Sequence, residues 1–116
     1  MSRAASNTTT AQFGQRFEIA MENRVEDVVN VRQLAVTATV VEVAPKASGD
    51  TRRRGLLLYN SGTSDILLCF GDQPATSTRW NWKLKADEAW WAMGLRCKVT
   101  AIRSTTNTTL QVGDVL

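Results

Sequence analysis

Residues 53–71 read RRGLLLYNSGTSDILLCFG. Two apolar runs of strand length, the first ending at Tyr59 and the second spanning residues 66–70, flank a patch of Asn, Ser, Gly, Thr and Asp. These polar residue types relax the backbone and hydrogen-bond to it locally, so the chain can reverse at the patch. The stretch therefore predicts a β-hairpin. Because a hairpin cannot bury its own apolar face, this one must pack on further sheet.

The chain beyond residue 33 supplies that sheet. Residues 34–43 alternate and are rich in β-branched side chains, which is typical of a strand, and Pro45 and Gly49 mark the loop that follows. Further short strands are expected at 80–85, 89–93, 96–102 and 108–112. About seven to eight short strands with regular turns predict an all-β domain, an antiparallel β-sandwich that is jelly-roll-like, over residues 34–116.

Residues 1–33 have a different pattern. The first ten or so are rich in Ser, Thr, Asn and Ala and lack the apolar core of a secretory signal. Farther along, Phe17 and Met21 recur at helical spacing, whereas Ile19 and Val31 also fit an extended segment. We expect residues 1–33 to form an N-terminal arm that is extended or partly helical.

Charge and length limit the kinds of partner. The chain has 116 residues and a net charge of +3, with much of the basic excess at residues 52–54. This excess allows contact with an acidic surface but is too small to indicate a nucleic-acid partner. No apolar run approaches the roughly 18 residues of a membrane-spanning helix. We therefore expect no membrane partner and no specific nucleic-acid partner.

The chain offers little for catalysis. It contains no histidine, and its adjacent carboxylates Asp87 and Glu88 are explained most simply as turn residues. Without histidine, Cys69 and Cys97 cannot form a usual structural zinc site. They are most simply two buried free thiols, although a disulfide is possible if their strands adjoin. We expect no enzyme, no metal and no cofactor.

Four tryptophans lie close together in the sequence. Trp80 and Trp82 alternate with Leu84 on one face of a strand, which favours a place in the core. Trp90 and Trp91 are neighbours, so in a strand one of them faces outward and marks a candidate protein interface. The alternative is that these rings form a stacking platform for nucleobases or sugars.

The order of motifs from Arg53 to Leu110 is also informative. A basic start leads to an apolar strand and then Asn60-Ser61-Gly62, and a second strand ends in Phe70-Gly71. A loop with Pro and Thr, an aliphatic strand, an acidic turn and an aromatic strand follow. This pattern resembles the small β-sandwich proteins encoded among the virion genes of tailed bacteriophages. The resemblance covers about half the chain and leaves the N-terminal third and the extra tryptophans unmatched.

The resemblance implies a decoration, or cement, protein of a phage capsid. Such a protein binds the outer face of the major capsid protein lattice, bridges neighbouring subunits and lies beside copies of itself. It would be made in the cytoplasm of the host bacterium and would end on the exterior of the virion. The alternatives are another virion component, in the tail, neck or fibre base, and a module that binds single-stranded nucleic acid or glycan.

Contacts with the capsid are expected from three groups of residues. Apolar arm residues would order on neighbouring subunits, the arginine run would dock on acidic capsid patches, and one tryptophan would face the partner. The candidates are Phe13, Phe17, Ile19, Met21, Arg52, Arg53, Arg54 and Trp91.

Overall fold

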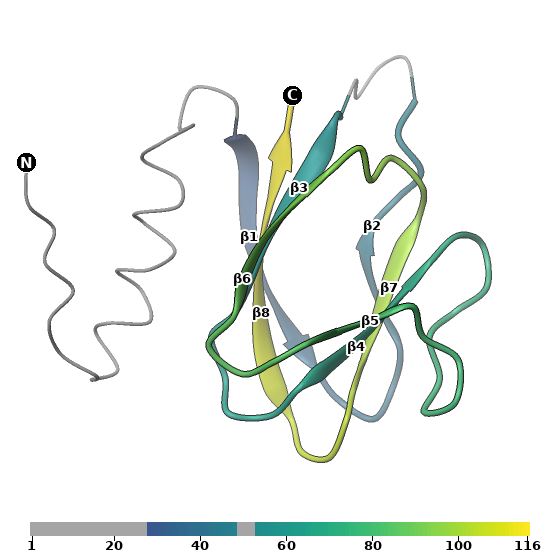
Figure 1. The fold of residues 1–116 in the computed structure, drawn as a ribbon, viewed down its shortest axis with the longest axis vertical. Helices are drawn as coiled ribbons and strands as arrows, with labels where there is room; N and C mark the ends of the chain where they lie inside the picture. The colour runs from purple at the N-terminus through teal and green to yellow at the C-terminus, as the bar shows by residue number, and fades with distance from the viewer. Residues whose placement is uncertain (1–27, 49–52) are drawn as a thin grey trace, which may run out of the picture.

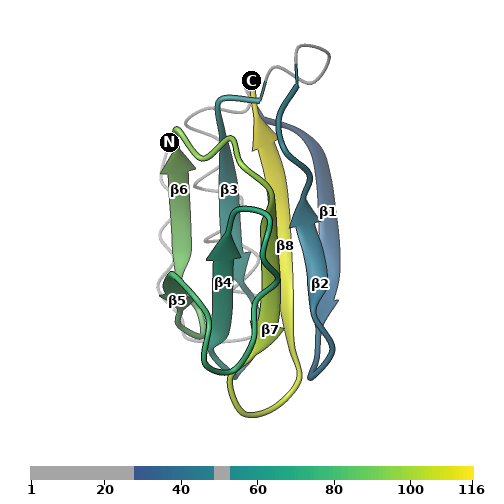
Figure 2. The same ribbon diagram turned by 90° about the vertical axis from the view of Figure 1, so that its right-hand side faces the viewer.

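A computed structural model describes residues 28–48 and 53–116 of the chain. These residues form β-strands in two four-stranded antiparallel sheets that pack face to face, and they include no helix (Figures 1 and 2). The strands are β1 (Val28–Val36), β2 (Val41–Ala44), β3 (Gly55–Asn60), β4 (Ile66–Phe70), β5 (Trp82–Leu84), β6 (Ala89–Met93), β7 (Val99–Arg103) and β8 (Thr108–Val115).

The order of the strands is that of a jelly roll. One sheet has the order β1-β8-β3-β6 and the other has the order β2-β7-β4-β5. Each strand is followed along the chain by a strand of the opposite sheet, except that β5 follows β4 within one sheet. Two four-stranded sheets connected in this way are a double-sheet jelly roll. The predicted all-β, jelly-roll-like sandwich is confirmed.

The two strands of residues 53–71 form as predicted, but they do not pair with each other. β3 pairs with β6 and β8, and β4 pairs with β5 and β7. The predicted hairpin is therefore wrong, and the segment is an arch that carries the chain from one sheet to the other. All residues of β3 and all but the last of β4 are buried. Strands apolar on both faces need neighbours on both sides, which makes them central strands.

Asn60 organises this arch from a fully buried position. Its Nδ2 donates to the carbonyl oxygens of Ser64 at 2.8 Å and Leu84 at 3.0 Å. Its Oδ1 accepts from the backbone N–H of Gly62 at 3.1 Å and from the hydroxyl of Thr108 at 2.9 Å. A Cβ added to Gly62 would lie 1.9 Å from Thr108 Oγ1, so the close approach requires glycine.

The predicted strand over residues 34–43 is divided in two. β1 ends at Val36 and β2 begins at Val41 in the opposite sheet. Between them the backbone N–H of Thr39 donates to Thr37 Oγ1 at 3.1 Å, a local turn bond that an alternating β-branched run does not reveal. At its other end, β1 extends back to Val28, so part of the segment assigned to the arm belongs to the sandwich.

The main core lies between the two sheets and is almost entirely aliphatic. Its buried members include Val36, Val43, Leu56, Leu58, Ile66, Leu68, Leu84, Val99, Leu110 and Val112. A second cluster, on the opposite face of the β1-β8-β3-β6 sheet, contains Val28, Leu57, Tyr59 and Val115. β3 contributes to both clusters because successive side chains of a strand point to opposite faces.

Candidate functional site

Three aromatic rings lie along one side of the sandwich. β5 and β6 are edge strands of the two different sheets, and both lie on this side (Figure 2). Trp82 of β5 and Trp90 of β6 stack with ring centroids 4.8 Å apart and an interplanar angle of 24°. Phe70 lies 6.1 Å from Trp90 in a tilted arrangement. We call Phe70, Trp82 and Trp90 the aromatic edge.

The aromatic edge joins the core to the surface. Trp90 and Phe70 are partly buried and pack against the main core, whereas 41% of Trp82 is exposed. Trp80 is also 41% exposed, and Lys83 Nζ lies 5.5 Å from the centroid of its ring. The predicted core position of Trp80 and Trp82 is therefore wrong. β5 has three residues and lies at the rim, where only Leu84 reaches the interior.

A hollow of about 360 Å³ adjoins the aromatic edge. It is lined by Phe70, Trp90, Trp91, Ala92, Met93, Gly94 and Leu95. None of these residues carries a charged or hydroxyl side chain, and Met93 is 44% exposed. Such a lining suits the apolar side chains of a protein partner better than a sugar, which needs several polar groups to fix its orientation.

A second hollow, of about 550 Å³, lies at the turn between β7 and β8. Hydroxyl side chains such as Thr76 and Thr105 line it together with Arg103. The guanidinium of Arg103 donates to Asn107 Oδ1 at 2.6 Å, so an intramolecular partner already holds it. Within the described ranges, no group of three or more potential metal ligands gathers in either hollow or elsewhere.

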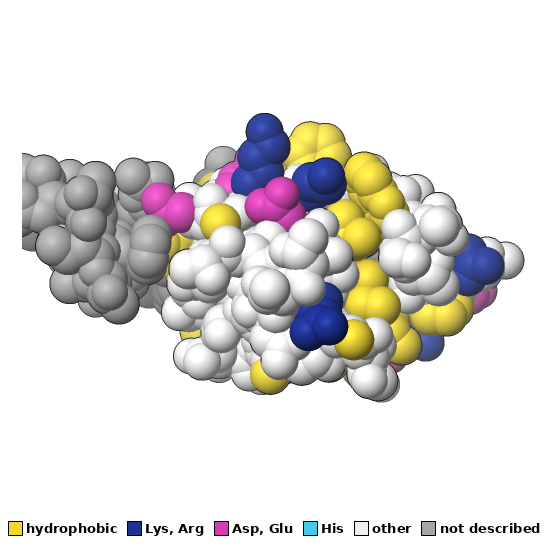
Figure 3. All heavy atoms as spheres, turned by 90° about the horizontal axis from the view of Figure 1, so that it is seen from below, with side chains coloured by type: hydrophobic (Ala, Val, Ile, Leu, Met, Phe, Trp, Pro, Cys, Tyr) yellow, Lys and Arg dark blue, Asp and Glu magenta, His cyan; other side chains and the backbone are white. Residues whose placement is uncertain are grey.

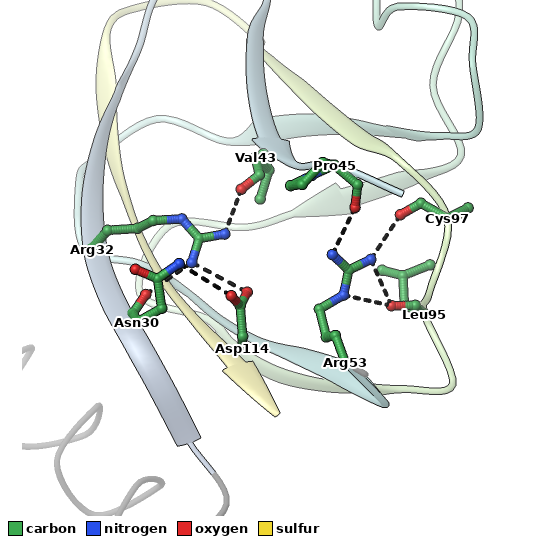
Figure 4. Close-up of polar contacts among 8 residues, drawn as sticks. All are labelled: Asn30, Arg32, Val43, Pro45, Arg53, Leu95, Cys97 and Asp114. Atoms are coloured by element: carbon green, nitrogen blue, oxygen red, sulfur yellow. Dashed lines mark hydrogen bonds and ion pairs between the residues drawn. The ribbon is translucent and has the colours of Figure 1, made fainter. Parts of the chain in front are cut away.

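Arg53, a predicted partner contact, is an internal residue. Only 3% of it is exposed, and its guanidinium donates to the carbonyl oxygens of Pro45 at 2.8 Å, Cys97 at 2.8 Å and Leu95 at 3.2 and 3.3 Å (Figure 4). Burial lowers the pKa of Arg53, while the negative charge of Asp114 opposes this shift. Arg53 therefore ties the segments after β2 and before β7 together and presents no exposed charge to a partner.

The other predicted contact residues have different positions. Arg54 is exposed, and its Nε donates to the carbonyl oxygen of Leu116 at 2.6 Å. The backbone carbonyl of Arg54 accepts from Gly94 N–H at 2.7 Å, which places Arg54 beside the end of β6. Trp91 is half-buried and packs against the smaller cluster on the outer face of its sheet. The remaining candidates, Phe13, Phe17, Ile19, Met21 and Arg52, lie outside the described residues.

A second arginine, the partly buried Arg32, links the two sheets and was not expected from the sequence. Arg32 Nη1 lies 3.2 Å from Asp114 Oδ1, and its Nη2 donates to the carbonyl oxygen of Val43 at 2.7 Å (Figure 4). The register of β1 shifts between Val29 and Arg32, where Asn30 has a φ of 54°. This bulge redirects the Arg32 side chain, and only the pairing of β1 with β8 brings Asp114 near it.

The two cysteines are free thiols. Cys69 is buried in β4, and Cys97 is partly buried in the segment before β7. The prediction that both thiols are free is therefore confirmed, whereas the predicted burial holds for Cys69 and not fully for Cys97.

No helix long and apolar enough to span a membrane occurs in the part of the chain that the structure describes. No family model and no curated protein matches the sequence. Among solved structures, the chain is similar to PirA, with a TM-score of 0.48 and 12% sequence identity. The alignment covers 72% of this chain and 92% of the PirA chain. A likeness of this degree carries no information about function.

Proposed function

We propose that the protein is a non-catalytic decoration protein that binds the outer surface of a phage capsid and bridges neighbouring major capsid protein subunits. The observation that carries the proposal is the apolar surface formed by the aromatic edge and its hollow. Trp82 and Met93 expose 41% and 44% of their surface there. Large exposed apolar side chains and an apolar hollow at the surface are typical of protein interfaces.

The charges around this surface suit an acidic partner. Lys83, Lys85 and Arg96 are exposed on or next to the strands that carry it. Seen from the lower end of the molecule, hydrophobic side chains form a band with Lys and Arg side chains next to it, and Asp and Glu side chains lie beside some of these (Figure 3). Apolar contacts surrounded by positive charge would give binding that weakens as salt rises, because the charges steer association and are screened by ions.

Stabilisation of the shell would be mechanical. A specific contact buries about 1,000 Å² or more, and a contact that spans two capsid subunits opposes their separation. Repetition over many equivalent positions increases the total effect without any single contact being strong. We expect the sandwich to act as a rigid body, because nearly all of its buried side chains are aliphatic and its central strands are paired on both sides.

The test uses capsids from a phage mutant that lacks this protein. Purified full-length chain is added, and the bound fraction is measured by co-sedimentation at increasing salt. We expect saturable binding in many copies per capsid, and Trp82→Gln should weaken it at least tenfold. Val40→Gln is the matched control, since Val40 has similar exposure, 39%, and lies in the segment between β1 and β2. Absence of binding, or binding in only a few copies, would contradict a decoration role and favour a tail or neck component.

The arm can be tested separately. Because β1 begins at Val28, deletion of residues 1–27 removes no residue of the described strands. If the arm contributes contacts on neighbouring subunits, the shortened chain will bind these capsids more weakly and stabilise them less against heat. Unchanged binding and unchanged capsid melting would remove the arm from the mechanism.

A second candidate function rests on Trp80. Its exposed ring lies near the ammonium group of Lys83, an arrangement in which a base could stack while a phosphate pairs with the lysine. Titration with a single-stranded oligonucleotide at low salt would quench tryptophan fluorescence if this function holds. Unchanged fluorescence would exclude it.

A further inference from the structure

The outer face of the β2-β7-β4-β5 sheet carries the hollow of about 550 Å³. Val99 and Ala101 of β7 belong to the main core, so the alternate residues of this strand point to the opposite face. Those residues are Thr100 and Ile102. The loop after β4 lies on this side of the sheet (Figure 1), and its Ala75 N–H donates to the hydroxyl of the buried Thr100 at 2.9 Å. Ile102, farther along the same face, lines the hollow.

Three segments form the walls of this hollow, and hydrogen bonds hold each of them in place. The loop after β4 is held by the bond just described. The turn between β1 and β2 is joined to the end of β7, where Arg103 N–H donates to the carbonyl oxygen of Thr37 at 3.0 Å. The turn after β7 is held by Ser104 N–H, which donates to the carbonyl oxygen of Asp65 at 3.0 Å. A hollow that is already formed costs a ligand little ordering of the protein.

The lining combines aliphatic surface with one positive charge. Arg103 is the one charged residue among the described residues that line the hollow, and no aromatic ring is among them. Ligand pockets of this size are typically lined by apolar groups together with a few polar groups that orient the ligand. The apolar members here are Ala38, Val40, Pro74, Ala75 and Ile102.

The charge of Arg103 has no negative partner among the described residues. Its Nη1 donates to Asn107 Oδ1 at 2.6 Å, and that amide oxygen carries no formal charge. The bond orients the guanidinium and leaves Nη2 and Nε without a partner in the part of the chain that the structure describes. A guanidinium that is held in place and still charged favours an oxyanion, which can accept from two N–H groups at once.

Hydroxyl groups supply further donors around this charge. Ser77 and Ser104 are exposed, line the hollow and make no side-chain hydrogen bond with any described residue. The hydroxyl of Thr105 is already bonded to Ser64 Oγ at 3.1 Å. A neutral sugar would need more polar partners than these, and a purely apolar molecule would leave the charge of Arg103 unused. The lining therefore fits a molecule that has both an aliphatic body and an anionic group.

We propose that this hollow binds a small organic anion, namely a carboxylate or a phosphate ester carried on an aliphatic body. The anionic group binds at Arg103, with the adjacent Ser104 as a further donor, and the aliphatic body covers Val40 and Ile102. The hollow shares no lining residue with the hollow beside the aromatic edge. The proposal therefore does not depend on the capsid role.

The experiment is a titration of the isotope-labelled full chain, followed by its amide chemical shifts. The probes are hexanoate and hexyl phosphate, which carry the two anionic groups on the same alkyl chain. We expect saturable shifts at lining residues such as Ala38, Ser77 and Ser104. Acetate, which lacks the alkyl chain, and hexanol, which lacks the charge, should each bind at least fivefold more weakly than hexanoate. The tighter of the two probes identifies the anionic group that the site prefers.

Two variants separate the charge from the aliphatic surface. Arg103→Gln should weaken hexanoate binding at least fivefold and leave hexanol binding unchanged. Arg96→Gln is the matched control, because it removes the same charge from an exposed side chain before the opposite end of β7. Ala38→Phe, on an exposed turn, should fill part of the hollow and weaken hexanoate and hexanol alike. Circular dichroism spectra establish that the variants remain folded.

Absence of saturable shifts at the lining residues with both anions would overturn the proposal. Equal affinity for hexanoate and hexanol, or wild-type affinity of the Arg103→Gln variant for hexanoate, would also overturn it, because the charge of Arg103 would then contribute nothing. Shifts that gather at the aromatic edge instead would assign the anions to that surface and contradict this site.

Discussion

The indole rings of Trp82 and Trp90 stack with centroids 4.8 Å apart, although the two residues belong to different sheets. The contact spans the side of the sandwich where both sheets end. Trp90 also packs on the core, so it connects the ring of Trp82 to the core. One pair of rings therefore closes the sandwich and supplies part of its exposed apolar surface. The stability of the fold and the proposed binding are consequently linked at this edge.

Removal of the Trp82 ring should destabilise the fold moderately. We expect Trp82→Ala to lower the free energy of unfolding by about 1–2 kcal/mol, because it loses one stacked aromatic pair and uncovers Trp90. Trp80→Ala, which removes a ring of equal exposure that has no aromatic partner among the described residues, should cost about 0.5 kcal/mol or less. Urea unfolding followed by circular dichroism measures both. Equal effects of the two substitutions would show that the stack contributes nothing.

Replacement of Asn60 should be much more harmful. Asn60→Ala leaves four partners of the amide without it, three of them in buried residues, so we expect a loss of about 3 kcal/mol or more in the free energy of unfolding. Asn107→Ala is the control, because that amide is exposed and accepts only from Arg103 in the described part of the chain. A loss below about 1 kcal/mol for Asn60→Ala would refute the view that this network fixes the arch.

The geometry of Arg53 predicts that lysine cannot replace it. A lysine ammonium keeps the charge but cannot reach three divergent carbonyl oxygens with a planar fork. We expect Arg53→Lys to lower the free energy of unfolding by about 2 kcal/mol, whereas Arg79→Lys, on an exposed loop, should be nearly neutral. Guanidinium chloride titrations compare the two. A neutral Arg53→Lys variant would show that the carbonyl contacts do not depend on the guanidinium shape.

The two thiols should differ in reactivity. Cys97 is partly buried and Cys69 is buried, so a thiol reagent should modify Cys97 first and reach Cys69 only when the sandwich opens. The Cys97→Ser variant should show only the slow phase of thiol modification, which comes from Cys69. The Cys69→Ser variant should show only the fast phase, which comes from Cys97. Two thiols should react in denaturant without any reductant, and the finding of fewer than two would indicate a disulfide.

The sequence predicted the strands better than their partners. β3 and β4 lie within the quoted stretch as expected, because continuous apolar runs bounded by turn residues specify buried strands locally. Their pairing was wrong because a reversal of the chain looks the same in sequence whether it closes a hairpin within one sheet or an arch between two. The same holds near the end of the chain, where β7 and β8 follow each other in sequence but belong to opposite sheets.

At the candidate site, too, the sequence predicted some features and could not predict others. Trp91 was named from the sequence because it neighbours Trp90 in a strand, so that one of the two faces outward, and Arg54 because it belongs to a run of arginines. Alternation placed Trp82 on the face of Leu84, but it could not show that Trp82 lies at the rim of the sheet, where the core ends. The sequence also could not distinguish the buried Arg53 from the exposed Arg54, since that difference depends on carbonyl groups of segments that arrive from elsewhere in the chain.

The sequence by itself determined that this is a jelly-roll-like β-sandwich, because strand-forming runs, turn residues and apolar content are local properties that each segment carries with it. Tertiary structure alone decided which sheet each strand joins, which arginine is buried and which tryptophans reach water. Those outcomes depend on pairing between residues far apart in the chain, and the burial of a side chain is settled only when its neighbours from other strands are in place.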